Sequence, residues 1–88
     1  KLEDVKYFKS EANYISVVME NQKILTLMTL KELEPKLPGF FQKVHRSFII
    51  NLNKIDTIDN KSLEIGRDHI PISQRYEKDL FNKIDLLN

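Results

Sequence analysis

Four polar residues occur where a strand is predicted to end or a helix to begin: Asn13, His45, Arg46 and Arg75. Arginine can donate two hydrogen bonds to guanine O6 and N7, asparagine can pair with adenine in the same way, and histidine can donate to or accept from a base edge. Free amides at a helix start near Gln74 and Arg75 could also bind a phosphate oxygen. These residue types suit contact with nucleic acid.

Each of these residues also has a purely structural interpretation. Asn13 could be a turn former, His45 a half-buried packing residue, and Arg46 and Arg75 exposed surface charges. An arginine in the first turn of a helix opposes the helix dipole, and an anion at the same place would reverse that penalty. Arg75 is therefore easier to explain beside phosphate than in isolation.

The charge of the chain is unevenly distributed. The net charge is only +1, with 14 Lys and Arg against 13 Asp and Glu, so it leaves no overall footprint for nucleic acid. Residues 35–55, however, contain no acidic residue. The basic residues of this stretch are Lys36, Lys43, Arg46 and Lys54, with His45 among them. The stretch forms a cationic patch if it folds onto one face, and an ordinary solvated face if counter-charges fold in from elsewhere.

Other kinds of chemistry have little support in the sequence. The chain has no cysteine, and His45 and His69 do not form a His-x-x-x-His pair, so we expect no metal site. With only Gly39 and Gly66, the chain cannot form a glycine-rich phosphate loop. A triad of Ser47, His45 and an aspartate could be imagined, but 88 residues offer little room for a deep pocket. We therefore expect no enzyme and no cofactor.

The first half of the chain predicts strands and one short helix. Residues 5–8 are aromatic and β-branched, which favours a strand. Residues 14–19 and 24–28 each divide into two alternating sets of side chains and flank a polar turn, which predicts a hairpin. Thr29 opens a Thr-x-x-Glu capping box, so a helix should begin there. Pro35 should end or kink that helix within two turns.

The second half begins with a less regular segment. Ser47 could cap a helical turn that Asn51 or Asn53 would close. Short strands that form a second hairpin or meander are then predicted at residues 55–58, 63–65 and 69–72. Because Pro71 cannot donate to a ladder, the last strand should lie at a sheet edge.

A C-terminal helix is predicted after Ser73, which is a good N-cap. Its apolar stripe at helical spacing consists of Tyr76, Leu80, Ile84 and Leu87. Strands dominate, helices are short, and no strand-helix-strand rhythm indicates a parallel sheet. The expected fold class is thus mainly antiparallel β, in one domain over residues 1–88.

Four segments resemble the LytTR domain family. They are residues 8–15 (FKSEANYI), 29–34 (TLKELE), 40–51 (FFQKVHRSFIIN) and 70–76 (IPISQRY). The His-Arg-Ser motif is the most specific, and the resemblance covers nearly the whole chain. It implies an elongated fold of small antiparallel β-sheets with short helices, the output module of response regulators that usually carry an N-terminal receiver domain. Pro35 departs from the family's usual Glu, which affects only the helix boundary.

The same resemblance implies a binding site. In the family, loops at one end of the sheets enter successive major grooves, and domains bind tandem repeats in promoters. By motif, the residues that contact bases would be Asn13, Arg46 and Arg75, with Tyr14 as the alternative to Asn13. Neighbouring contacts, mostly to phosphate, would come from Tyr14, Lys43, His45, Ser47 and Gln74.

We therefore expect sequence-specific binding to double-stranded DNA by a cytoplasmic transcription regulator. The chain would be one domain of a longer protein whose receiver or other input domain is missing, and useful affinity would require a dimer on adjacent repeats. The alternative is a protein-interaction module that uses the basic patch or an exposed sheet edge. A hydrolase that uses His45 is a third hypothesis, and membrane attachment of the parent protein stays open.

Overall fold

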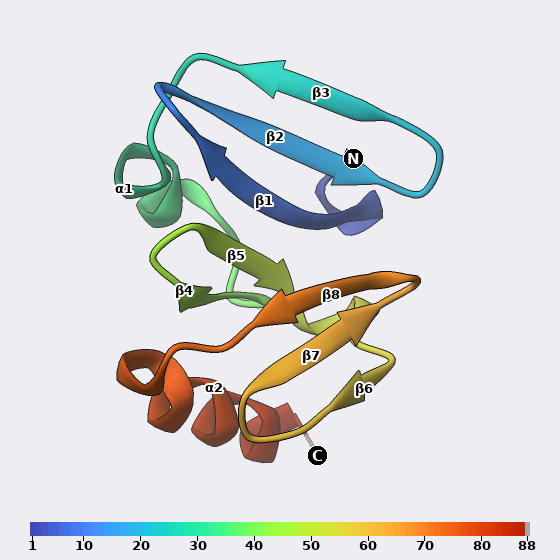
Figure 1. Ribbon diagram of the computed structural model, residues 1–88, viewed down its shortest axis with the longest axis vertical. Helices are drawn as coiled ribbons and strands as arrows, with labels where there is room; N and C mark the ends of the chain where they lie inside the picture. The colour runs from blue at the N-terminus through green and yellow to red at the C-terminus, as the bar shows by residue number, and fades with distance from the viewer. Residues whose placement is uncertain (88) are drawn as a thin grey trace.

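Strands of the computed structural model, which describes residues 1–87, form two antiparallel sheets (Figure 1). The larger sheet has the order β3-β2-β1-β5-β4. Its strands are β1 (Val5–Glu11), β2 (Tyr14–Met19), β3 (Lys23–Thr26), β4 (Phe41–His45) and β5 (Phe48–Asn51). The smaller sheet, in the order β6-β7-β8, consists of β6 (Thr57–Ile58), β7 (Ser62–Ile65) and β8 (Asp68–Pro71). The pairings are antiparallel, which confirms the predicted fold class.

The helices are short except for the last one. They are α1 (Leu30–Leu33), α2 (Gln74–Leu87) and the 3₁₀ turns Leu2–Asp4, Glu34–Lys36 and Leu52–Lys54. In Figure 1 the larger sheet lies above the smaller one, and α2 runs along the bottom. The molecule measures 32 × 26 × 21 Å. Its longest axis is vertical in Figure 1 and runs from β3 at the top to α2 at the bottom.

The capping box predicted at Thr29 is present and begins α1. The Thr29 hydroxyl accepts from the Glu32 amide at 3.1 Å, and the Glu32 carboxylate accepts from the Thr29 amide at 2.9 Å. These two bonds satisfy free amides of the helix start. The bond from the Thr29 amide is also the main reason why the pKa of Glu32 is lowered. The helix gives way to a 3₁₀ turn that contains Pro35, as expected.

Strand β5 separates two hydrophobic cores. Ile49 is 1% exposed and packs with Phe8 of β1 and Leu30 of α1, in the core between the larger sheet and α1. Its neighbour Ile50 is 0% exposed and packs with Leu80 on the other side, against the smaller sheet and α2. Successive side chains of a strand point to opposite faces, so one strand contributes to both cores. The members of the two cores are Val5, Phe8, Ile15, Leu30, Phe41 and Ile49, and Val44, Ile50, Leu52, Leu63, Ile65, Ile70, Ile72 and Leu80.

The predicted helical turn after Ser47 is wrong. Ser47 lies in the turn of a hairpin formed by β4 and β5, and the residues after it continue as strand. The pattern was misleading because a strand that is buried on both faces shows no polar alternation. Asn51 instead precedes the 3₁₀ turn, where its side-chain oxygen accepts from the Asn53 amide at 2.9 Å. Its amide nitrogen donates to the Val5 carbonyl at 2.8 Å, which links β5 to β1.

Most of the other predicted elements are confirmed, with shifted boundaries. The first hairpin forms from β2 and β3, and β1 extends three residues beyond its predicted end at Phe8, to Glu11. Strand β8, which contains Pro71, is an edge strand. Helix α2 begins directly after Ser73 and buries Leu80 completely. The side chain of Leu87 lies outside the described part of the chain.

Tyr7 joins the two sheets. Its hydroxyl donates to the Asp68 carboxylate of β8 at 2.9 Å, and its ring lies 5.9 Å from the ring of Phe48 on β5. Burial and the hydrogen bond to Asp68 raise the pKa of Tyr7 from 10.0 to about 12. A raised tyrosine pKa means that the folded state favours the protonated hydroxyl, so this link stabilises the fold only while the proton is present.

We expect Tyr7→Phe to lower the free energy of unfolding at pH 7 by about 1 to 3 kcal/mol, because the Asp68 carboxylate loses its donor. In the wild type this contribution is complete below pH 10 and is lost as the pH rises to about 12. Urea denaturation at several pH values should show that loss in the wild type and not in the variant. Tyr14→Phe is the matched control, because Tyr14 is also half-buried. Equal losses in both variants would contradict the link.

Candidate nucleic-acid interface

Two turns and one helix start lie along a single edge of the molecule. Residues 12–13 join β1 to β2, residues 46–47 join β4 to β5, and α2 begins at Gln74. In Figure 1 all three lie on the left edge, one below the other along the long axis. We call this surface the turn edge. The predicted site residues are on these three segments or directly beside them.

Backbone hydrogen bonds connect the three segments of the turn edge. The Ser10 amide of β1 donates to the Ser47 carbonyl at 2.8 Å, which joins the upper turn to the middle one. The Ser73 amide, directly before α2, donates to the Val44 carbonyl of β4 at 2.9 Å, which joins the middle hairpin to the helix start. The backbone of the edge is therefore one connected unit.

The upper turn presents Asn13 to solvent. It is a two-residue turn in which Ala12 has φ 55°, the left-handed conformation that tight hairpins require. Tyr14, which follows it, is half-buried. The nearby Glu11 carboxylate accepts from the Ser16 hydroxyl, and this bond is the main reason why the pKa of Glu11 is lowered. The carboxylate is thus held by the sheet while the Asn13 side chain stays exposed.

The middle turn presents Arg46. The register of β4 against β5 shifts between Lys43 and His45, directly before the turn. Arg46 is exposed and His45 is half-buried. The Ser47 amide donates to Nδ1 of His45 at 3.0 Å, and the His45 ring meets the ring of Phe48 edge-on at 5.7 Å.

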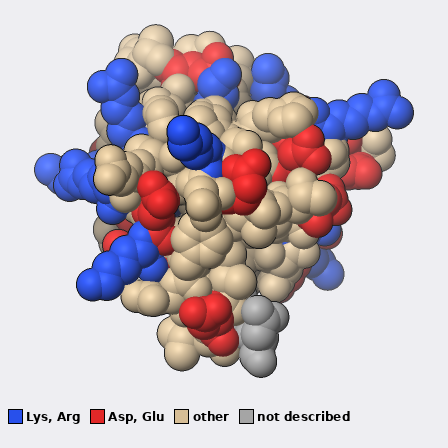
Figure 2. Space-filling view, turned by 60° about the horizontal axis from the view of Figure 1, so that its bottom comes forward, with Lys and Arg blue, Asp and Glu red and all other residues tan. Residues whose placement is uncertain are grey.

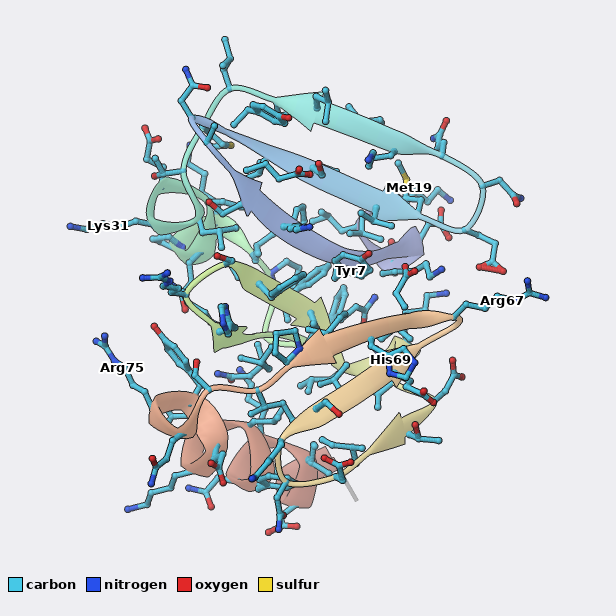
Figure 3. The ribbon with its side chains drawn as sticks, in the orientation of Figure 1. Tyr7, Met19, Lys31, Arg67, His69 and Arg75 are labelled. Carbon is cyan, nitrogen blue, oxygen red and sulfur yellow. The ribbon has the colours of Figure 1, made fainter. Side chains whose placement is uncertain are left out.

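The third segment presents Gln74 and Arg75 on the first turn of α2, and both are exposed. The Arg75 guanidinium lies 5.5 Å from the centre of the Tyr76 ring. The Lys43 ammonium lies 5.8 Å from the same ring. The Tyr76 ring therefore lies close to one cation from β4 and one from α2. In Figure 3 Arg75 points outward from the turn edge.

The basic stretch of residues 35–55 does not form a single patch. Lys43 and Arg46 belong to the turn edge, whereas Lys54 lines a cleft with Lys6, Glu20 and Asp56. Lys6 and Glu20 form an ion pair at 3.7 Å. On the face that Figure 2 shows, Lys and Arg alternate with Asp and Glu. The cationic residues of this stretch that a ligand at the turn edge can meet are thus Lys43 and Arg46.

The fold brings one further basic residue, Lys31, to the side of the molecule that carries Arg75. In the sequence, Lys31 stood out only as part of a capping box. Figure 3 shows Lys31 on α1, pointing outward on the same side as Arg75. Arg67, by contrast, points away from the opposite side of the molecule. The available signal was an exposed basic residue in a short helix that directly follows the first hairpin. Only the fold shows that this helix faces the same side as the turns.

Within residues 1–87, no three His, Cys, Asp or Glu side chains are grouped so that they could hold a metal ion. The helices of that part of the chain are also too short or too polar to cross a membrane. Together, the fold and the turn edge define a small β domain that offers amide, imidazole and guanidinium groups from turns and a helix start.

Comparison with known proteins shows the family. The model of the LytTr DNA-binding domain matches residues 1–85, so the chain belongs to the LytTR DNA-binding domain family. An uncharacterized response regulatory protein of Yersinia pestis is 37% identical over 98% of the chain, and the sensory transduction protein LytT of Enterococcus faecalis is 33% identical over 96%. The chain spans 38% of the length of each of these two relatives.

A solved structure has the same fold. The LytTr DNA-binding domain of a response regulator from Bacillus cereus superposes with a TM-score of 0.85 at 27% identity, covering 93% of this chain and 82% of that one. The predicted family and fold are thereby confirmed, and the domain is of a DNA-binding class. The roles of individual residues remain predictions.

We expect Lys31→Ala to reduce the salt dependence of duplex binding, because one phosphate contact fewer releases fewer counterions. The slope of log K against log salt should become shallower by about 0.9. Arg67→Ala is the matched control, since it removes a cation from the opposite side and should leave the slope unchanged. Fluorescence anisotropy with a labelled duplex at several salt concentrations measures both. Equal slopes for Lys31→Ala and the wild type would remove α1 from the interface.

Proposed function

We propose that the chain is the sequence-specific DNA-binding output domain of a bacterial transcription regulator. The observation that carries the proposal is the turn edge, where Asn13, Arg46 and Arg75 stand exposed on three hydrogen-bonded segments of one side. Exposed side chains on a fixed backbone suit readout of base edges, because the backbone loses little conformational entropy when DNA binds. The domain needs no cofactor and no catalytic group for this role.

Base contacts would come from one residue of each segment. Arg46 and Arg75 can each pair two donors with guanine, and Asn13 can pair with adenine. Tyr14 is the alternative contact in the upper turn. The 32 Å length of the molecule is close to one turn of B-DNA, about 34 to 36 Å, so segments spread along that axis can reach successive grooves.

Contacts to phosphate would fix the register of the domain on the duplex. The free amides at the start of the 14-residue helix α2 and its dipole favour an anion there. A phosphate at that place would also offset the unfavourable position of Arg75 at a helix start. The side chains proposed for such contacts are Tyr14, Lys43, His45, Ser47 and Gln74, together with Lys31 of α1.

The arrangement of the longer protein is a further part of the proposal. One of the similar proteins is named as a response regulatory protein and the other as a sensory transduction protein, and both are much longer than this chain. We infer that residues 1–88 are one domain of a cytoplasmic regulator with a receiver or other input domain. Because one small domain buries little surface, useful affinity would come from two copies on tandem promoter repeats, where tethering raises the effective concentration.

A second candidate function is a protein contact at the edge of the larger sheet. Strand β3 lies at that edge and exposes 47% of Ile24 and 58% of Leu25, and Leu27 beyond it is 79% exposed. Such an edge could accept a strand from a protein partner. Hydrogen exchange separates the candidates, because DNA should protect amides near His45 and Ser73, whereas a strand partner should protect β3.

Selection of bound sequences from a random duplex library tests the proposal. The wild type should enrich a defined motif, and Arg46→Ala and Arg75→Ala should each lose preference at one base position, at a cost of about 1 to 3 kcal/mol. Lys43→Ala should weaken binding to all sequences alike, because a phosphate contact carries no base information. An unchanged motif in both arginine variants would refute the assignment of these residues. Failure of the wild type to enrich any sequence at low salt would favour the protein contact.

A further inference from the structure

The turn that follows His45 selects one tautomer of its neutral imidazole. Nδ1 accepts a hydrogen bond from the Ser47 amide at 3.0 Å. An acceptor nitrogen carries no proton, so the neutral ring must hold its proton on Nε2. Nε2 has no hydrogen-bond partner among the described residues, and it is not a buried orphan, so its N–H faces solvent.

The orientation of the ring is fixed by the sheet. The His45 ring meets Phe48 edge-on, with an interplanar angle of 69°. Phe48 in turn packs on Tyr7, whose hydroxyl is bound to Asp68 of the smaller sheet. A row of rings therefore connects the ring of His45 to the junction of the two sheets. Rotation of the imidazole would disturb this row as well as the bond to Ser47.

The backbone of Ser47 is bound on both sides as a result. Its amide donates to His45, and its carbonyl accepts from the Ser10 amide at 2.8 Å. Arg46 lies between His45 and Ser47 in the chain, and its own side chain is exposed. The direction in which the Arg46 side chain leaves the turn is thus set by the residues on either side of it.

We propose that His45 is a positioning residue for Arg46. Nδ1 fixes the backbone of the turn, and the outward Nε2–H donates to a phosphate oxygen of the bound DNA. The two nitrogens therefore do separate work: Nδ1 supports discrimination between base sequences, and Nε2 supports affinity for any sequence. This inference rests on the proposed function, because it assumes that Arg46 contacts a base.

Two substitutions separate the work of the two nitrogens. In His45→Asn the side-chain oxygen can take the place of Nδ1, but no donor reaches the position of Nε2. In His45→Gln the amide nitrogen can take the place of Nε2, but no acceptor lies at the position of Nδ1. The two variants are matched controls for each other, since both replace the ring with a neutral amide and both lose the contact with Phe48.

Binding of the two variants should be measured on a selected duplex and on one with the base pair opposite Arg46 changed. We expect His45→Asn to bind both duplexes more weakly but to keep the wild-type ratio between them. His45→Gln should lose that ratio, which is roughly 5- to 140-fold for a bidentate base contact. Equal ratios in the two variants would overturn the proposal. A wild type without any preference would instead refute the proposed function, so the two failures are distinguishable.

The tautomer of His45 can be measured without DNA and without a variant. Nitrogen-15 NMR of the neutral imidazole in the wild-type domain should show His45 Nε2 as the protonated nitrogen and Nδ1 as the unprotonated one. His69 gives an internal comparison, because its Nε2 lies 3.0 Å from the Glu64 carboxylate. A proton on Nδ1 of neutral His45 would overturn the proposal even if both variants failed to fold.

Discussion

Burial of strand β5 on both faces is the constraint on which the rest of the structure depends. Ile49 belongs to the core between the larger sheet and α1, and Ile50 belongs to the core shared by the smaller sheet and α2. A shift of one residue in the pairing of β5 would exchange these side chains between the two cores and displace Asn51 from Val5. The register of the β4–β5 hairpin is therefore strongly specified, and both hydrophobic cores are built on it.

This constraint determines where an exposed binding surface can stand on rigid support. The turn between β4 and β5 leaves the most buried part of the molecule, and hydrogen bonds through Ser10 and Ser73 attach the neighbouring segments to the same hairpin. Arg46 is therefore exposed at its side chain and restrained at its backbone. A surface of this kind loses less conformational freedom on binding than a flexible loop would. The exposed β3 edge lies outside this connected unit.

Local patterns in the sequence predicted local structure well. The capping box at Thr29, the effect of Pro35 and the edge position of Pro71 depend on a residue and a few neighbours, and all three are present. The prediction for the segment after Ser47 was wrong for a non-local reason. A strand that is buried on both faces lacks the alternation that identifies most strands. Lys31 was missed as a candidate because the direction of α1 is decided by its packing and not by its own residues.

The sequence by itself determined the family, the mainly antiparallel β class, and the residue types at turns and helix starts, because motifs and periodicity are local properties. Only the tertiary structure decided which turns share an edge, that Lys54 lies away from Arg46, and that Nδ1 of His45 is occupied by Ser47. Tyr7 and Asp68 are 61 residues apart in the chain and 2.9 Å apart in space. Contacts of that kind arise from the packing of two sheets around β5, and no short stretch of residues records that packing.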